Sequence, residues 1–349
     1  MMLIHGGDWA GFQQEYGSMP LDFSANISPL GLPEGVREAL VKAAFSCERY
    51  PDPLCRALCG QLALRENLPE AFILCGNGAA DLIYRAVLAK RPRRALLAAP
   101  TFAEYAQALE LAGCCTERFV LSQAEDFRLT EEFLRRIVPG VEMVFLCEPN
   151  NPTGILTPRG LLERILEQCC RAGALLVVDE CFLDFVEEPE AHTMAGFLAG
   201  CPNLLILKAF TKLYAMAGVR LGYALCADRA LLDGMRAAGQ PWAVSELAQQ
   251  AGIAALQETE YVRRVRALVS RERPRLAREL ETLGLRVFPG EANYLMFYGP
   301  RRLDERLREK GVLIRSCANY PGLGSCFYRT AVRTPEENRE LILRMREVL

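Results

Sequence analysis

Short apolar runs alternate with longer amphipathic stretches over much of the chain, from about residue 49 to residue 225. The apolar runs have the length and composition of buried strands, and the stretch at residues 159–171 is one of the predicted helices. The strands predicted from this pattern are residues 72–75, 95–99, 143–147, 174–178 and 204–208. Strands and helices that alternate in this way predict βαβ units and a mostly parallel sheet.

The pattern changes at residues 241–248, after which long charged helical stretches continue to about Gly284, the expected C-terminal stop. Shorter strands are predicted at residues 286–288, 294–297, 312–315 and 327–332, before a closing helix from Thr334. We therefore expect a large domain at residues 46–245 and a smaller α+β domain at residues 246–349. The N-terminal segment, residues 1–45, is expected to pack with the smaller domain.

The composition gives no indication of a nucleic-acid-binding, membrane-spanning or secreted protein. A chain of 349 residues is long enough for a large core and a second domain. Its 41 basic and 43 acidic residues leave a net charge of −2, so nothing indicates binding to nucleic acid or to an anionic membrane. No apolar run approaches the ~20 residues of a membrane span, and the N-terminal segment lacks the regions of a signal peptide. We expect a cytoplasmic protein without a membrane partner.

The 14 cysteines invite a disulfide or metal-site interpretation. A protein of this size needs no disulfides, and several cysteines sit within apolar strands or helices, among them Cys75, Cys147 and Cys226. The chain has no Cys-x-x-Cys motif and only two histidines, His5 and His192, so we predict no metal site. Buried, reduced thiols in a cytosolic enzyme are the better interpretation.

Lys212 follows the predicted strand at residues 204–208, with Thr211 beside it and Arg220 further on. A lysine that attacks an aldehyde must be neutral, so it needs partial burial and a nearby cation to lower its pKa. A hydroxyl and a guanidinium can hold the phosphate of a cofactor that carries the aldehyde. By itself, a solvated lysine after a strand explains this stretch equally well.

Two further features lie at strand ends. The turn at residues 148–154 contains two prolines and a glycine, which expose side chains after the strand at residues 143–147. Asp179 ends the apolar run at residues 174–178, and a buried carboxylate there needs a partner. A protonated pyridine nitrogen is a suitable partner, and the pairing would keep that ring an effective electron sink.

A glycine-rich turn at residues 76–81 leads from a short strand into a helical run. Such turns present free amides and the positive end of the helix dipole to a phosphate. A plain strand–helix turn explains it equally well, and it lacks the third glycine of the dinucleotide-binding fingerprint. Together with Lys212, Asp179 and the turn at residues 148–154, however, this turn strongly indicates a site for a cofactor that carries an aldehyde and a phosphate.

With these features the chain resembles the fold-type I pyridoxal 5'-phosphate (PLP) enzymes, in the class I/II aminotransferase-like branch that includes histidinol-phosphate aminotransferase. The resemblance covers essentially the whole chain. It implies an α/β fold: a large domain with a mostly parallel seven-stranded sheet and helices on both faces, plus a smaller α+β domain. It also implies that Lys212 bonds to the PLP aldehyde, that Asp179 pairs with the pyridine nitrogen, and that Asn151 binds the ring hydroxyl.

The same resemblance implies the other cofactor contacts. The phosphate-binding residues would be Gly78, Ala79, Thr211 and Arg220. Phe102 matches the aromatic residue that stacks on the ring, and Tyr50 matches the tyrosine that reaches the cofactor phosphate of the partner subunit. The implied assembly is a homodimer with an active site shared across the interface.

Two positions depart from the family pattern. Phe182 stands where many relatives have a tyrosine that touches the ring hydroxyl, so that donor is lost. Ala209 stands where a serine or threonine often binds the phosphate, which should cost about 0.5–1.5 kcal/mol. Neither change removes the chemistry.

The two ends of the chain resemble the L-threonine-O-3-phosphate decarboxylase group of this family, which serves the cobalamin pathway. The matching segments are residues 5–8, 22–31, 313–323 and 327–333, and Phe182 also fits that group. By this resemblance Arg329 would hold the substrate carboxylate with Asn151 and Asn26 nearby, whereas Arg315 and His5 would hold the substrate phosphate. Arginine suits both anions because its planar fork matches them. Arg333 receives no role.

Other functions remain open from the residues. A histidinol-phosphate-type aminotransferase shares nearly every cofactor residue. A decarboxylase of L-serine O-phosphate differs only by a methyl group of the substrate, worth about 1–3 kcal/mol of discrimination. A cofactor-binding regulatory module without chemistry is the alternative from another class.

Overall fold

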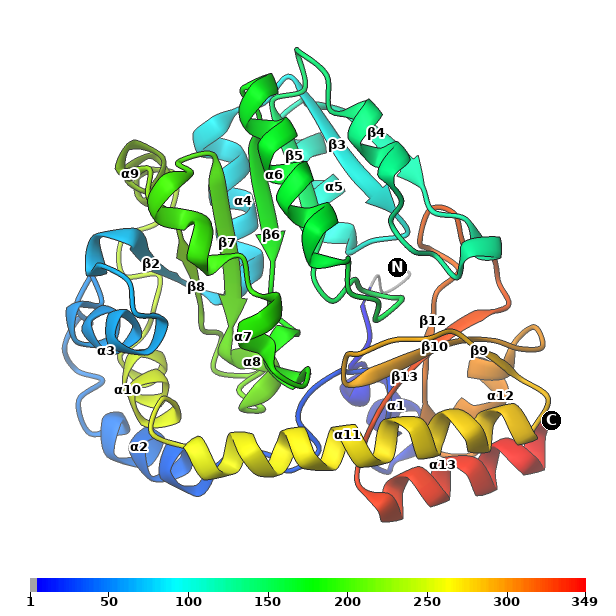
Figure 1. The fold of residues 1–349 in the computed structure, drawn as a ribbon. Coiled ribbons are helices and arrows are strands. Elements are labelled where there is room, and N and C mark those ends of the chain that lie inside the picture. Colours follow the sequence, from blue (N-terminus) through cyan, green and yellow to red (C-terminus); the bar gives the residue numbers. More distant parts are fainter. Residues whose placement is uncertain (1–4) are drawn as a thin grey trace.

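A computed structural model describes residues 5–349 (Figure 1). Within that range the largest sheet has seven strands in the order β2-β8-β7-β6-β5-β3-β4. Its strands are β2 (Ile73–Gly76), β3 (Arg94–Ala99), β4 (Cys115–Val120), β5 (Met143–Cys147), β6 (Leu175–Asp179), β7 (Leu204–Ala209) and β8 (Gly222–Leu225). All neighbouring pairs are parallel except those of β8, which runs antiparallel to both β2 and β7. The predicted mostly parallel seven-stranded sheet is therefore confirmed.

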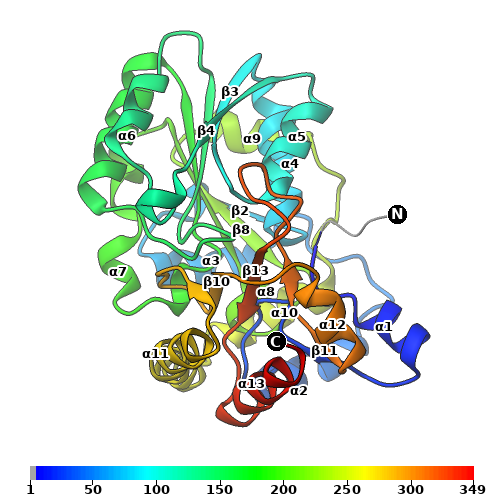
Figure 2. The ribbon, with the colours of Figure 1, turned by 90° about the vertical axis from the view of Figure 1, so that its right-hand side faces the viewer.

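Helices cover both faces of this sheet (Figures 1 and 2). The helices that begin before residue 246 are α1 (Trp9–Tyr16), α2 (Glu34–Ala44), α3 (Arg56–Glu66), α4 (Gly78–Lys90), α5 (Ala103–Leu111), α6 (Arg159–Ala172), α7 (Pro189–His192), α8 (Phe210–Leu213) and α9 (Arg229–Ala237). Successive strand residues point to opposite faces. In β5, Val144 packs in the core with α3 and α6, whereas Phe145 packs on the other face with α4, α5 and α9.

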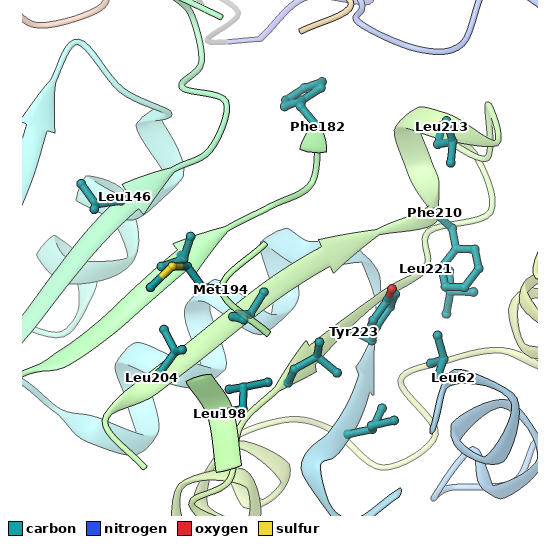
Figure 3. Packing of buried hydrophobic residues seen from close by; sticks show 14 of the residues in the cluster. Leu62, Leu146, Phe182, Met194, Leu198, Leu204, Phe210, Leu213, Leu221 and Tyr223 are labelled. Atoms are coloured by element: carbon teal, nitrogen blue, oxygen red, sulfur yellow. The ribbon is translucent and has the colours of Figure 1, made fainter. Parts of the chain in front are cut away.

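Buried side chains continue to the carboxyl ends of the strands. Phe182 follows β6 and is buried, as are Phe210 and Leu213 of α8 after β7 (Figure 3). This packing fixes the backbone on both sides of Lys212. The segments that carry the predicted chemistry therefore stand on a rigid support.

The C-terminal part of the chain builds a second, smaller unit. Its elements are α10 (Glu246–Ala255), α11 (Thr259–Thr282), β9 (Arg286–Val287), β10 (Tyr294–Tyr298), α12 (Leu303–Glu309), β11 (Val312–Leu313), β12 (Arg315–Ser316), β13 (Phe327–Ala331) and α13 (Pro335–Val348). Four of these strands form an antiparallel sheet in the order β12-β13-β10-β9. Helix α11 spans the lower edge of the molecule beside α13 (Figure 1).

One prediction for this region needs correction in detail. The strand predicted at residues 312–315 is two strands, because β11 pairs with β1 (Leu21–Asp22) and β12 pairs with β13. The helices predicted before Gly284 are present as α10 and α11, and α11 ends at Thr282. Gly284 has φ +80°, the left-handed conformation that favours glycine after a helix.

The N-terminal segment joins the smaller unit to the active-site region. Strand β1 pairs with β11, and Phe23 is buried in the core of the smaller unit. Further on, the Ser28 amide donates to the Lys212 carbonyl (2.8 Å). The domain boundaries at residues 45 and 245 stay predictions. In the described chain no helix has the length and apolar character needed to cross a membrane.

Candidate active site

The predicted cofactor residues converge where strands β5, β6 and β7 end, the edge at which parallel sheets bind ligands. A cavity of about 110 Å³ lies there. It is lined by Ala79, Ala80, Phe102, Cys147, Asn151, Asp179, Cys181, Phe182, Ala209, Thr211, Lys212 and Arg220. Every predicted cofactor residue except Gly78 and Tyr50 is in this set. Residues that span more than 140 positions of sequence therefore share one small cavity.

Lys212 has the electrostatic environment of a nucleophilic amine. Burial lowers the pKa of its ammonium group to about 8, and the cations Arg329 and Arg220 act in the same direction. The Asp179 carboxylate opposes this shift. With such a pKa roughly a quarter of the amine is neutral at pH 7.5, against about a thousandth for an ordinary lysine. The chemistry proposed from the sequence is therefore accessible near neutral pH.

Asp179 is buried, and its carboxylate is held by two neighbours. The Tyr105 hydroxyl donates to Oδ2 (2.7 Å), and the Cys181 amide donates to Oδ1 (3.0 Å). A carboxylate oxygen has two lone pairs, so each oxygen can accept one more hydrogen bond. The group is oriented and can still take a further donor such as a protonated ring nitrogen.

Asn151 is oriented by Arg329. Its Oδ1 accepts from Arg329 Nη1 and lies 3.4 Å from the Tyr320 hydroxyl. Because the amide oxygen already faces donors, the amide Nδ2 is left as the donor toward the cavity. That polarity suits a ring oxygen, and the Phe182 ring supplies no competing hydroxyl.

The turn before α4 fits a phosphate group. Gly78 has φ +80°, and a Cβ built there would lie 2.6 Å from Arg220 Nη2, so only glycine lets the guanidinium approach. A Cβ at Gly222 would likewise lie 2.6 Å from the Ala79 nitrogen. Helix amides, a guanidinium and the Thr211 hydroxyl thus meet at one side of the cavity. This donor set is the kind that binds phosphate.

A second cavity of about 380 Å³ opens from the first. It is lined by His5, Gly6, Ser24, Ala25, Asn26, Ala80, Phe102, Glu104, Asn151, Phe182, Lys212, Arg220, Arg315, Tyr320 and Arg329. All the predicted substrate residues are in this set. The two cavities share Lys212, so a molecule in the larger one has access to the amine.

Arg315 and Arg329 are both buried and lie on neighbouring strands, where β12 pairs with β13. Arg329 donates to the Ser24 carbonyl (2.9 Å), and the Asn26 amide oxygen, turned toward the guanidinium, accepts at 3.1 and 3.3 Å. Arg315 donates to Asn319 (2.7 Å). Two guanidinium groups held by separate partners provide two sites for anions.

His5 stands at the mouth of this cavity. Its Nε2 lies 2.7 Å from Glu104 Oε1, and its ring lies 5.7 Å from the Phe102 ring. The Tyr84 hydroxyl donates to the other oxygen of Glu104 (3.0 Å). The position predicted from a resemblance alone is therefore held by a defined carboxylate contact.

Two residues lie elsewhere. Tyr50 lines neither cavity; it is 79% exposed and stacks on Trp242, with 4.5 Å between ring centroids. Arg333, which received no role, contacts the Asp22 carbonyl (3.2 Å) and Glu337 (2.7 Å). Arg333 thus joins the N-terminal segment to α13 and does not face the cavities.

Some residues of the site were missed from the sequence, namely Tyr105, Glu104, Cys181 and Tyr320. Tyr105 and Glu104 belong to the same short segment as Phe102, and their spacing from it along α5 was the available signal. Nothing in the sequence indicated which of their neighbours they contact.

A larger cavity, of about 580 Å³, lies away from these residues between α3, α7 and α11. Its partly buried Lys208 donates to Glu66 (2.9 Å), which also accepts from the Tyr223 hydroxyl. Burial opposes the charge of Lys208, but Glu66 and Glu180 raise its pKa. These charges satisfy one another, which is the pattern of a structural ion pair. Among the described residues no group of histidine, cysteine and acidic side chains is placed to hold a metal.

Known proteins are similar to this chain in fold and in sequence. Residues 18–345 match the family described as Aminotransferase class I and II. The chain is 40% identical to the threonine-phosphate decarboxylase of Salmonella typhimurium, over 99% of this chain and 96% of that protein. It is 35% identical to the histidinol-phosphate aminotransferase of Desulfitobacterium hafniense, over 93% of this chain and 91% of the relative. The crystal structure of the histidinol-phosphate aminotransferase from Clostridium acetobutylicum superimposes with a TM-score of 0.88 at 26% identity, covering 94% and 98% of the two chains.

Proposed function

Because the chain belongs to the aminotransferase class I and II family, we propose that it is a PLP-dependent threonine-phosphate decarboxylase. The product would be (R)-1-amino-2-propanol phosphate, for the nucleotide loop of cobalamin. The observation that carries this proposal is the pair of buried arginines, Arg315 and Arg329, each with its own partners beside Lys212. A substrate with both a carboxylate and a phosphate needs two such sites.

The cofactor residues would act as a set around the smaller cavity. Lys212 would bond to PLP, Asp179 would face the ring nitrogen, and Asn151 would donate to the ring oxygen. The turn at Gly78 and the Arg220 guanidinium would hold the phosphate. When bound, PLP supplies an electron sink for the pair of electrons left when a bond to the substrate Cα breaks.

The two anion-binding sites would determine which bond to the substrate Cα breaks. Arg329 would grip the carboxylate while Arg315 and His5 hold the phosphate, which fixes the orientation of the substrate over Lys212. Binding the carboxylate stabilises the ground state and by itself opposes its loss, so the gain must come from orientation. The bond between Cα and the carboxylate would then break, and carbon dioxide would leave. Lys212, with its amine free and protonated, would donate a proton to Cα, and the electron pair from the broken bond would form the new Cα–H bond.

A homodimer is part of the proposal. Exposed apolar side chains occur on α2 and in the segment after it, namely Val41, Phe45, Tyr50 and Leu54, and Tyr50 stacks on the partly exposed Trp242. A surface of this kind is typical of an interface. Tyr50 would then reach the cofactor phosphate of the partner subunit. Light scattering during gel filtration should give twice the mass of the 38.9 kDa chain.

We also propose a cytoplasmic location for the enzyme. All 14 cysteines are free thiols. Free thiols in this number suit a reducing compartment.

The test is direct. Purified protein with PLP and threonine phosphate should release carbon dioxide and form no keto acid, and Lys212→Ala should lose both the visible absorption band of bound PLP and the activity. Keto acid without carbon dioxide would instead establish an aminotransferase, which the similarity to histidinol-phosphate aminotransferase makes the second candidate. Serine phosphate, tested in parallel, measures the contribution of the substrate methyl group.

A further inference from the structure

Tyr105 connects two residues of the cofactor cavity without lining it. The side chain is fully buried, and its hydroxyl donates to Asp179 Oδ2 at 2.7 Å. Its ring stacks on Phe145 (4.9 Å between centroids) and meets the edge of the Phe102 ring (5.6 Å). Tyr105 therefore touches both the predicted stacking residue and the predicted partner of the ring nitrogen.

The hydrogen bond to Asp179 has a defined direction. Burial, followed by the negative charge of Asp179, raises the pKa of the Tyr105 hydroxyl well above its usual value, so the hydroxyl keeps its proton. The nearby Cys147 thiol, whose pKa burial also raises, lies 3.3 Å from the Pro149 carbonyl and can donate to it. An ionised carboxylate only accepts. The Tyr105 proton therefore points at Asp179.

The groups that interact with the Asp179 carboxylate come from several parts of the chain, including Tyr294 of β10. They also include Tyr105 from α5, Cys147 from β5, Cys181 after β6, and Lys212 from α8. Cys181 supplies the amide that holds Oδ1, and Tyr105 supplies the hydroxyl that holds Oδ2. Loss of the hydroxyl would leave the carboxylate held only at Oδ1, so its plane would be less well fixed.

We propose that Tyr105 is a positioning residue that acts through Asp179 on the PLP ring. The inference rests on the proposed PLP function. Its hydrogen bond fixes the plane of the carboxylate, and its ring supports Phe102 on the adjacent side of the cavity. One buried side chain thus sets the relative positions of Asp179 and Phe102, the two residues that would contact the ring.

Tyr105→Phe keeps the ring and removes only the hydroxyl. We expect PLP to be lost from the holoenzyme about three- to tenfold faster, measured with a PLP scavenger, which is the effect of one net hydrogen bond. The pH midpoint of the visible band reports the proton on the nitrogen that joins Lys212 to PLP. It should rise by about 0.5 unit or more, because a ring nitrogen that holds its own proton less well withdraws fewer electrons from that linkage. The kcat for threonine phosphate should fall while its KM changes little, since the anion sites are untouched.

Tyr328→Phe is the matched control. Tyr328 is also fully buried, and its hydroxyl donates to the Pro300 carbonyl (2.8 Å) within the smaller unit. This variant should lose similar thermal stability yet keep the PLP release rate and the spectral midpoint of the unmodified protein. Equal changes in both variants would mean that the Tyr105 effect is general loosening, and would overturn the proposal.

A double-mutant cycle tests the route of action. In an Asp179→Asn background, adding Tyr105→Phe should have no further effect on PLP release; an undiminished effect would show that Tyr105 does not act through Asp179. If Tyr105→Phe does not fold, Tyr105→His, which retains a donor, takes its place and should release PLP at a rate close to that of the unmodified protein. Fast release despite the retained donor would contradict the proposal. Failure of the unmodified protein to bind PLP would instead refute the proposed function itself.

Discussion

Replacing Arg329 with glutamine should weaken substrate binding and also lower the reactivity of the Lys212 amine. The guanidinium contacts Asn151 and the Ser24 carbonyl, which leaves it oriented for a substrate carboxylate. It is also the strongest cationic influence on the pKa of Lys212. Substrate binding and amine reactivity should therefore both change, and they can be measured independently.

The loss of substrate binding follows from the hydrogen bonds between the Arg329 guanidinium and the substrate carboxylate, which the substitution removes. A guanidinium can make two charge-assisted hydrogen bonds to a carboxylate, each worth about 1.5–3 kcal/mol. Arg329→Gln should therefore lower kcat/KM for threonine phosphate by about 10²- to 10⁴-fold. The measurement is carbon dioxide release over a range of substrate concentrations.

The effect on Lys212 has a definite sign. Arg329 disfavours the charged ammonium, so its removal raises the Lys212 pKa from its value of about 8. The neutral fraction at pH 7.5 then falls, and the rate at which added PLP develops its visible band should decrease. The pH profile of that rate should move to higher pH.

Arg333→Gln provides the control. Arg333 lies on the same part of the chain, but it contacts the Asp22 carbonyl and Glu337 instead of the cavity. It should lower stability by on the order of 1 kcal/mol and leave kcat/KM nearly unchanged. The assignment of Arg329 is refuted if both variants have similar kcat/KM, or if the pH profile of PLP attachment does not move.

Three more changes test other parts of the site. Gly78→Ala places a Cβ 2.6 Å from Arg220 at φ +80°, so PLP affinity measured by titration should fall at least tenfold; unchanged affinity would exclude the phosphate role of this turn. Arg315→Met should raise KM for threonine phosphate by about tenfold or more, while alanine as a phosphate-free ligand binds equally to both proteins; equal losses for both ligands would contradict a phosphate site. Burial raises the pKa of Glu148 from 4.5 to about 8, so the stability it contributes is complete below about pH 4.5 and is lost as pH rises through 8. Glu148→Gln should flatten this decline, on the order of 1 kcal/mol per pH unit, in urea unfolding measured between pH 5 and 8, and an unchanged slope would place the titration elsewhere.

The local pattern of apolar residues was sufficient to predict most strands of the seven-stranded sheet. Apolar runs such as residues 143–147 and 204–208 became β5 and β7 because their side chains are buried on both faces, which a continuous apolar run already indicates. The run at residues 312–315 was misjudged for the opposite reason. Its length suits one strand, but the partners β1 and β13 divide it at Ile314.

The sequence by itself determined which chemical groups are available: an amine at Lys212, a carboxylate at a strand end, a glycine turn before a helix, and two arginines near the C-terminus. Motif order and resemblance were enough to propose their roles, because the types of residue and their spacing along the chain are local properties.

Only the tertiary structure decided how these groups influence one another. The pKa of Lys212 depends on burial and on Arg329, more than a hundred residues away. Tyr105 belongs to α5, which packs on β3 and β4, yet its hydroxyl reaches Asp179 at the end of β6. Arg333 contacts Asp22 and Glu337 and does not line the cavity that Arg329 enters. Electrostatic and hydrogen-bond interactions act over a few ångströms in space, so they follow from packing and not from distance along the chain.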